Sequence, residues 1–216
     1  MKNESTESEI EKLTKKAAEG INKFLELSES GLRSIAEYGW YINELQTMGS
    51  STFLMEKAIN GDVEFLDKYF SDYYKENLER LTKIIINNQE SRSGIITEAI
   101  ACHEEKKYYA STILFLSLAD GICNGLLFTT KRNKESLRKY LAKNDNGSLI
   151  TILLGMITNE STIDEGYSKK EKNEKKLNRH SVVHGLEIHF GTEINSLKAF
   201  SLLSYVSGFI NRFKEN

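Results

Sequence analysis

The chain has 216 residues, of which 39% are hydrophobic and 28% are charged, so it can bury one sizeable core. Lys and Arg number 29 against 31 Asp and Glu, which gives a formal net charge of -2. This balance excludes a uniformly basic nucleic-acid-binding surface, and any binding of a polyanion must therefore be local.

The cysteines and the apolar runs indicate the compartment. Cys102 and Cys123 stand in apolar helical contexts rather than in a CxxC pair, and the first residues do not join a basic start to an apolar stretch. We therefore expect a cytoplasmic protein. The longest apolar runs, such as 113–118 and 149–156, are shorter than the roughly 20 residues that cross a bilayer, so we expect no membrane segment.

The first half of the chain has helical periodicity and, like the whole sequence, no proline to break it. Residues 4–28 place apolar side chains at steps of three and four, which predicts a helix packed on the surface of the core. The next segment, 31–48, carries the only tryptophan and is expected to end at a break over 49–51. A further helical run covers 62–87, and the polar residues 87–93 predict a loop.

The second half continues the helical pattern. Residues 94–128 predict two helices joined near 103–107, and 193–213 predict a final amphipathic helix. Residues 177–184 are expected to end a helix, because Gly185 supplies the residue that closes a helix C-terminus. In between, the sequence predicts a basic stretch at 131–143, a turn at 144–147, an apolar helix at 148–158 and a charged segment at 168–176. No strand-rich region is expected, so the predicted class is all-α.

One short motif combines the residue types of acid–base and phosphate chemistry. The segment from Leu177 to Gly185 reads LNRHSVVHG. It resembles the signature of the HEPN superfamily, in which an arginine with a polar neighbour is followed, after four to six positions, by a histidine. Here Arg179 matches the arginine, His180 the polar neighbour and His184 the terminal histidine, with four residues between Arg179 and His184.

A second segment, 105–122, looks like the long helix that precedes the motif in HEPN proteins, where an acidic residue often faces the site. Asp120 stands in that position. The resemblance covers about residues 94–213. It implies a HEPN-like antiparallel helical bundle at 91–216. Residues 1–90 lie outside the resemblance, and we expect them to form an additional N-terminal helical layer packed on this bundle, the two making one compact unit.

The resemblance implies metal-independent endoribonuclease activity that needs no cofactor. A histidine takes the proton from a ribose 2′-hydroxyl, which attacks the adjacent phosphate, while an arginine offsets the charge that builds on the phosphoryl oxygens. The residue types suit these tasks. Histidine has an unperturbed pKa of about 6.5, close to neutral pH, and arginine presents a fork of donors matched to phosphate.

The spacing of the motif adds a constraint, because positions five apart on a helix lie about 140° apart at 3.6 residues per turn. Arg179 and His184 therefore cannot share one narrow face. HEPN proteins typically dimerise so that two motifs line one cleft, and we expect a homodimer here. The resemblance also implies an RNA substrate and a role as a toxin or anti-phage defence effector, with a cognate antitoxin or defence-system partner. A toxin paired with an MNT-type partner would usually have tyrosine where Leu186 stands.

Residues beside the motif are candidate RNA contacts. Lys175 and Lys176 would place positive charge next to the phosphate site, and Asn178 and Ser181 could orient phosphate. The lysines could equally form a solvated face, and the two polar side chains could be ordinary surface. The basic run at 131–143 has the same two interpretations.

Several other interpretations of these residues remain open. His180 and His184 could bind a metal with Glu187 or His189, or could bond to backbone at a capped helix end. Asp120 could be an exposed helix residue or the partner of a buried arginine. In a separate segment, Trp40 with its neighbours Tyr38 and Tyr41 is expected in the core or an interface rather than stacking on bases. The competing function is a catalytically inactive HEPN-like helical module for dimerisation or binding.

Overall fold

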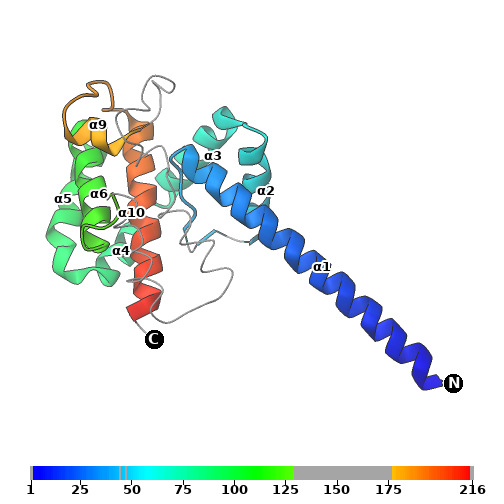
Figure 1. Ribbon diagram of the computed structural model, residues 1–216. Coiled ribbons are helices and arrows are strands. Elements are labelled where there is room, and N and C mark those ends of the chain that lie inside the picture. The colour runs from blue at the N-terminus through cyan, green and yellow to red at the C-terminus, as the bar shows by residue number, and fades with distance from the viewer. Residues whose placement is uncertain (1, 44, 47, 129–176, 215–216) are drawn as a thin grey trace.

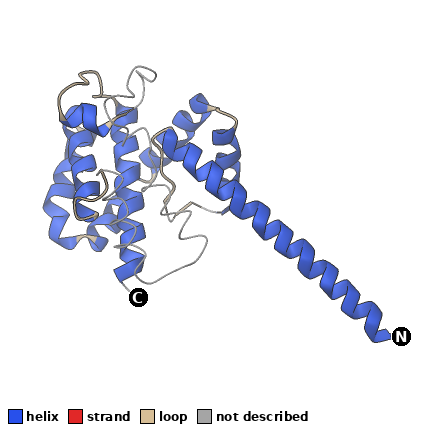
Figure 2. Cartoon of the chain, in the orientation of Figure 1, coloured by secondary structure: helices blue, strands red, loops and turns tan. Residues whose placement is uncertain are grey.

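The computed structural model describes residues 2–43, 45–46, 48–128 and 177–214, and this part of the chain is helical without strands (Figure 2). The predicted all-α class is confirmed. None of the described helices has the length and apolar character needed to span a membrane. The basic stretch, turn, helix and charged segment predicted between residues 131 and 176 lie outside the described residues. The helices are α1 (Lys2–Glu37), α2 (Met48–Ile59), α3 (Val63–Glu76), α4 (Leu78–Asn88), the 3-10 helix η1 (Glu90–Arg92), α5 (Ser93–Glu104), α6 (Tyr108–Ile122), α9 (Arg179–Val183) and α10 (Glu193–Lys214).

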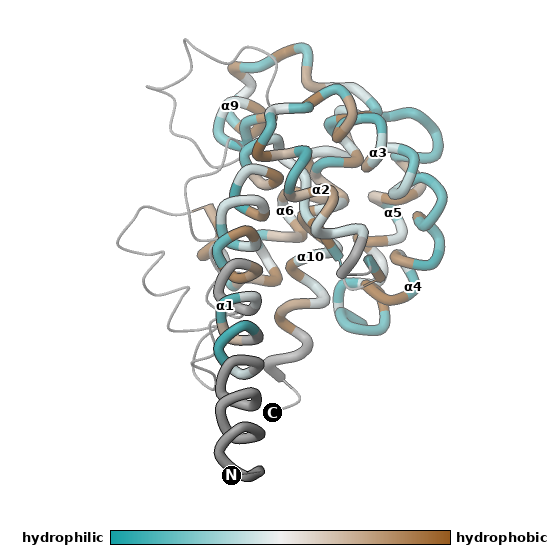
Figure 3. The backbone as a smooth tube through the Cα atoms, turned by 90° about the vertical axis from the view of Figure 1, so that its right-hand side faces the viewer, coloured by the Kyte–Doolittle hydropathy of each residue, from teal (hydrophilic) through white to brown (hydrophobic). Residues whose placement is uncertain are grey.

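Helix α10 is the centre of the bundle, with α6 on one side and α3 and α4 on others (Figure 1). Its predicted extent is confirmed, but its predicted amphipathic character is wrong over residues 196–207, which are all buried. Serines let neighbouring helices pack close to it without apolar side chains; the buried ones are Ser196, Ser201, Ser204 and Ser207. In Figure 3 hydrophilic turns lie on the outer side near α4 and α5, away from α10.

Helices α6 and α10 run side by side in the same direction. The hydroxyl oxygens of Ser111 and Ser196 lie 2.6 Å apart, and four residues further along both helices the rings of Phe115 and Phe200 have centroids 5.3 Å apart. Helix α5 runs the opposite way to α6, because α5 ends at Glu104 and α6 begins after a short turn. The junction predicted near 103–107 is therefore confirmed.

Helix α1 is longer than the sequence pattern predicts. It continues through Gly31 to residue 37, and its N-terminal half extends away from the body of the molecule (Figure 1). The break predicted at 49–51 is wrong, because α1 ends at Glu37 and residues 49–51 lie within α2. Gly31 is a packing residue, since a side chain there would collide with Met55 of α2.

The helical run predicted for 62–87 is two helices, α3 and α4, which meet at Asn77. The Asn77 side-chain amide donates a hydrogen bond of 2.9 Å to the Tyr73 carbonyl, which also accepts the Asn77 backbone N–H. Side chains that bond to their own backbone compete with helix continuation, so the division falls here. The loop predicted at 87–93 is largely helical, because α4 runs to Asn88 and η1 covers Glu90–Arg92. Helices on both sides of η1 pack on α10.

An ion pair between a buried lysine and a partly exposed aspartate joins α10 to α3 and to the segment after α1. Lys198 is only 6% exposed, and its Nζ lies 2.9 Å from Asp67 Oδ1. Trp40, fully buried as expected, donates its indole N–H to the same oxygen at 2.7 Å, and its ring centroid is 5.3 Å from the Lys198 Nζ. Removing the Asp67 carboxylate would leave the buried Lys198 charge without its ionic partner, which is strongly destabilising.

A second buried polar group connects α5, α10 and α6. His103 Nδ1 lies 2.8 Å from the Ser196 hydroxyl, which in turn lies 2.6 Å from the Ser111 hydroxyl. Burial lowers the pKa of His103 below its ordinary value, although the negative charge of Glu193 acts in the opposite direction. His103 is therefore held in its neutral form.

This arrangement predicts a loss of stability in mild acid. Below about pH 6.5 the unfolded chain protonates His103 while the folded chain resists it, so the free energy of unfolding falls by up to about 1.4 kcal/mol per pH unit until the lowered folded pKa is reached. Urea denaturation between pH 5 and 8 should show this dependence in wild type and in the exposed-residue control His189→Gln. It should be absent from His103→Gln, and an equal slope in all three proteins would contradict the prediction.

Candidate functional site

The motif histidines and arginine lie on and beside α9, a helix of five residues. The sequence predicted that this segment ends a longer helix, but α9 begins at Arg179 because the Asn178 side chain caps it, accepting the Ser181 N–H at 2.9 Å. His184 closes the other end. Gly185 follows with a φ of 67°, a left-handed conformation that suits glycine, so the predicted end of the helix is confirmed.

The side chains of the motif divide into two groups. The rings of His180 and His184 lie one turn apart with centroids 4.4 Å from each other, His180 half-buried and His184 exposed. Arg179 is half-buried and contacts a different neighbour: its guanidinium carbon lies 5.2 Å from the centroid of the Phe128 ring. In the described part of the chain, no hydrogen bond or ion pair engages any of these three side chains.

The two other predicted contacts on this segment have structural positions. Asn178 uses its side-chain oxygen for the cap, and Ser181 is 1% exposed, so its hydroxyl lies inside the protein rather than toward a bound phosphate. This position contradicts the expected RNA contact of Ser181. Lys175 and Lys176 lie outside the described residues.

The Asp120 side chain, expected to face the motif, makes its described hydrogen bond elsewhere. Its carboxylate accepts the backbone N–H of Leu127 at 3.1 Å, so it is directed to the loop that follows α6. Within the described residues it has no hydrogen bond or ion pair to α9. Sequence reasoning assigned Asp120 from its place on the helix alone, and a helix position does not determine which loop a carboxylate binds.

The alternative metal site is not formed in the described residues. No group of three or more His, Cys, Asp or Glu side chains gathers there in a way that could hold a metal ion. Glu187, one of the suggested ligands, instead accepts the backbone N–H of His189 at 2.9 Å.

An exposed apolar surface lies next to the motif, and we call it the apolar rim. Tyr109 at the start of α6 joins it to the segment after α9, because its hydroxyl donates to the Ile188 carbonyl at 3.0 Å. Sequence reasoning missed this surface, although apolar side chains around a glycine, outside any helical pattern, could have indicated it. Its members and their exposed fractions are Tyr109 (52%), Val183 (47%), Leu186 (47%) and Ile188 (66%).

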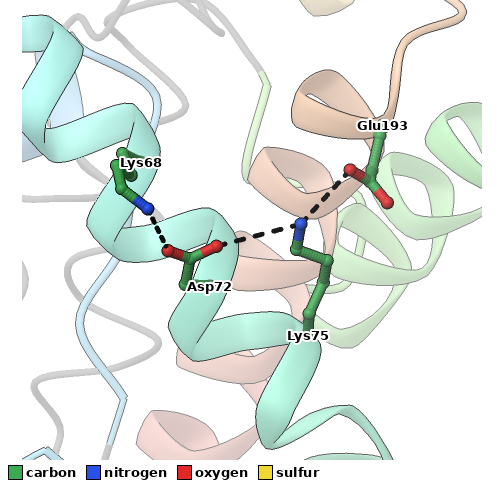
Figure 4. Close-up of polar contacts among 4 residues, drawn as sticks. All are labelled: Lys68, Asp72, Lys75 and Glu193. Carbon is green, nitrogen blue, oxygen red and sulfur yellow. Dashed lines mark hydrogen bonds and ion pairs between the residues drawn. The ribbon is translucent and has the colours of Figure 1, made fainter.

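A separate cleft of about 600 Å³ lies between α3 and the first turn of α10, away from the motif residues. Asp72 binds Lys68 at 2.8 Å and Lys75 at 3.9 Å, and Lys75 also binds Glu193 at 3.4 Å (Figure 4). The hydrogen bond from Lys68 lowers the pKa of Asp72. Because each of these lysines already has a carboxylate partner, the cleft offers little free positive charge to a polyanion.

No family model, curated protein or solved structure matches this chain. The HEPN resemblance therefore rests on the motif at 177–185 and its all-helical setting. The positions of Arg179, His180 and His184 on and beside α9 are the structural basis for a function.

The cap on α9 can be tested by itself. Asn178→Ala removes the oxygen that accepts the Ser181 N–H, which should cost about 1 kcal/mol of local stability. Hydrogen exchange of the Ser181 amide, followed by NMR, should become faster in this variant. Asn178→Asp keeps an acceptor and should preserve the protection, whereas equal exchange in wild type and Asn178→Ala would show that the cap does not hold α9.

Proposed function

We propose that this protein is a metal-independent endoribonuclease of HEPN type that acts as a homodimer. The observation that supports it is the state of the motif: α9 presents Arg179, His180 and His184 from one short segment, without hydrogen-bond or ion-pair partners in the described chain. Side chains in this state are free to bind substrate.

The proposed reaction assigns one task to each group. His184, the exposed histidine, takes the proton from a ribose 2′-hydroxyl, and the 2′-oxygen attacks the adjacent phosphorus. The bond from phosphorus to the 5′-oxygen breaks, leaving a 2′,3′-cyclic phosphate and a 5′-hydroxyl. His180 lies beside His184 and can supply the proton that the departing 5′-oxygen needs. Arg179 offsets the charge on the phosphoryl oxygens.

A second copy of the chain completes this site. Arg179 faces Phe128 while the histidines share another face of α9, so one protomer does not aim all three side chains at a single phosphate. The apolar rim lies next to the motif, and its exposed apolar side chains would lose contact with water by packing against an identical surface. Dimerisation through the rim would bring two α9 segments together.

The same apolar rim favours the second candidate function, a catalytically inactive helical module for dimerisation or binding. The two proposals share the interface and differ only in whether the motif cleaves RNA. The role as a cytoplasmic toxin or anti-phage defence effector, with a cognate antitoxin or defence-system partner, follows from the resemblance. So does the proposal that Lys175 and Lys176 attract RNA to the motif.

Cleavage of a mixed RNA pool in EDTA tests the activity. Wild type should generate 2′,3′-cyclic phosphate ends, and both Arg179→Ala and His184→Ala should reduce the rate at least about 100-fold, because each removes a group that acts in the transition state. His189→Ala removes an exposed histidine outside the motif and serves as the matched control. Intact RNA with wild type, or full activity in both motif variants, would leave the inactive binding module as the better proposal. Loss of activity in EDTA would contradict a metal-independent reaction.

The interface is tested by light scattering after gel filtration. Wild type should have twice the monomer mass of 24.6 kDa. The double variant Leu186→Lys with Ile188→Lys places two charges on the apolar rim and should give monomers with little RNA cleavage. Ile95→Lys, a similar change at an exposed position of α5, should remain dimeric. A monomeric wild type that cleaves RNA would contradict the shared site.

A further inference from the structure

The loop that follows α6 is tightly folded onto the end of that helix. The Gly125 N–H donates to the Asp120 carbonyl at 2.9 Å, and the Leu126 N–H donates to the Cys123 carbonyl at 3.1 Å. Asn124 between them has a φ of 58°. These bonds reverse the chain within a few residues of the helix end.

Asp120 also holds the far end of this loop through its side chain. Its Oδ1 accepts the backbone N–H of Leu127, seven positions further along the chain, at 3.1 Å. The Leu127 side chain is 2% exposed, so it anchors the same residue in the core. The hydrogen bond and the buried side chain together fix the backbone directly before Phe128.

The Phe128 ring is the neighbour of the motif arginine. It is half-buried and packs against the core, and the Arg179 guanidinium carbon lies 5.2 Å from its centroid. An aromatic face attracts a cation within about 6 Å. The backbone of Arg179 is fixed by the Asn178 cap, and the ring restricts the long side chain that extends from it.

We propose that Asp120 and Phe128 are positioning residues for Arg179: Asp120 fixes the loop that places the Phe128 ring, and the ring holds the guanidinium where a phosphate can bind it. Asp120 then acts through hydrogen bonding to Leu127 and not as an acid or base. The catalytic consequence rests on the proposed ribonuclease activity, whereas the contact between ring and guanidinium does not.

Two substitutions of Asp120 separate these roles. In Asp120→Asn the amide oxygen still accepts the Leu127 N–H, so RNA cleavage should be rescued relative to Asp120→Ala, in which kcat should fall roughly 10- to 100-fold because Arg179 is misplaced. The pH profile of kcat should keep the shape of wild type in both variants. An Asp120→Asn protein as inactive as Asp120→Ala, with one limb of the pH profile lost, would overturn the proposal and make Asp120 an acid or base.

The contact itself can be measured without RNA. In NMR spectra the Arg179 side-chain protons should be shifted upfield by the ring current of Phe128. The shift should be lost in Phe128→Leu, kept in Phe128→Tyr and reduced in Asp120→Ala, with circular dichroism confirming that each variant is folded. Identical Arg179 shifts in wild type and Phe128→Leu would overturn the proposal. If wild type cleaves no RNA but the shifts follow this pattern, the ribonuclease proposal fails and the positioning contact stands.

Discussion

The ion pair that the buried Lys198 forms with Asp67 is the constraint on which the rest of the fold depends. Lys198 lies on the central helix α10, so its charge must find a partner inside the bundle or remain in the core at a cost of several kcal/mol. That requirement holds α3 against α10, and the Trp40 indole, which shares the Asp67 carboxylate, holds the segment after α1 there as well. The segment after α1 and helix α3 are thereby attached to α10, the helix that follows the motif in the chain.

Helix α6 connects the central helix α10 to the motif. The hydrogen bonds that connect Ser196 with Ser111 and with His103 align α6 and α5 with α10. At its start α6 carries Tyr109, which binds the segment that follows α9, and after its end the loop brings Phe128 to Arg179. The short helix α9 is therefore attached to α6 from both sides. A five-residue helix has little stability of its own, so these attachments set its position.

The sequence was sufficient to predict α5, α6 and α10, because these apolar segments contain no proline and their ends coincide with turns. It failed where tertiary contacts decide. Glycine and serines at 49–51 indicated a break but lie in α2, and nothing in the period marks Asn77 as a division. At the site, the sequence placed the motif and its closing glycine. It could not place Phe128 beside Arg179 or direct Asp120 toward Leu127, because both depend on the path of a loop.

Two surfaces carry cations that could attract a phosphate, the cleft between α3 and α10 and the motif on α9. They differ in the neighbours of those cations. In the cleft between α3 and α10, Lys68 and Lys75 are paired with carboxylates, so an incoming anion would have to compete with Asp72 and Glu193. Arg179 is held by an aromatic face, which stabilises a cation without neutralising it. Among the described residues, no hydrogen bond or ion pair occupies its guanidinium, whose fork of donors matches phosphate oxygens. For a chain of net charge -2, local presentation of this kind is the physical route by which the proposed RNA substrate would be bound.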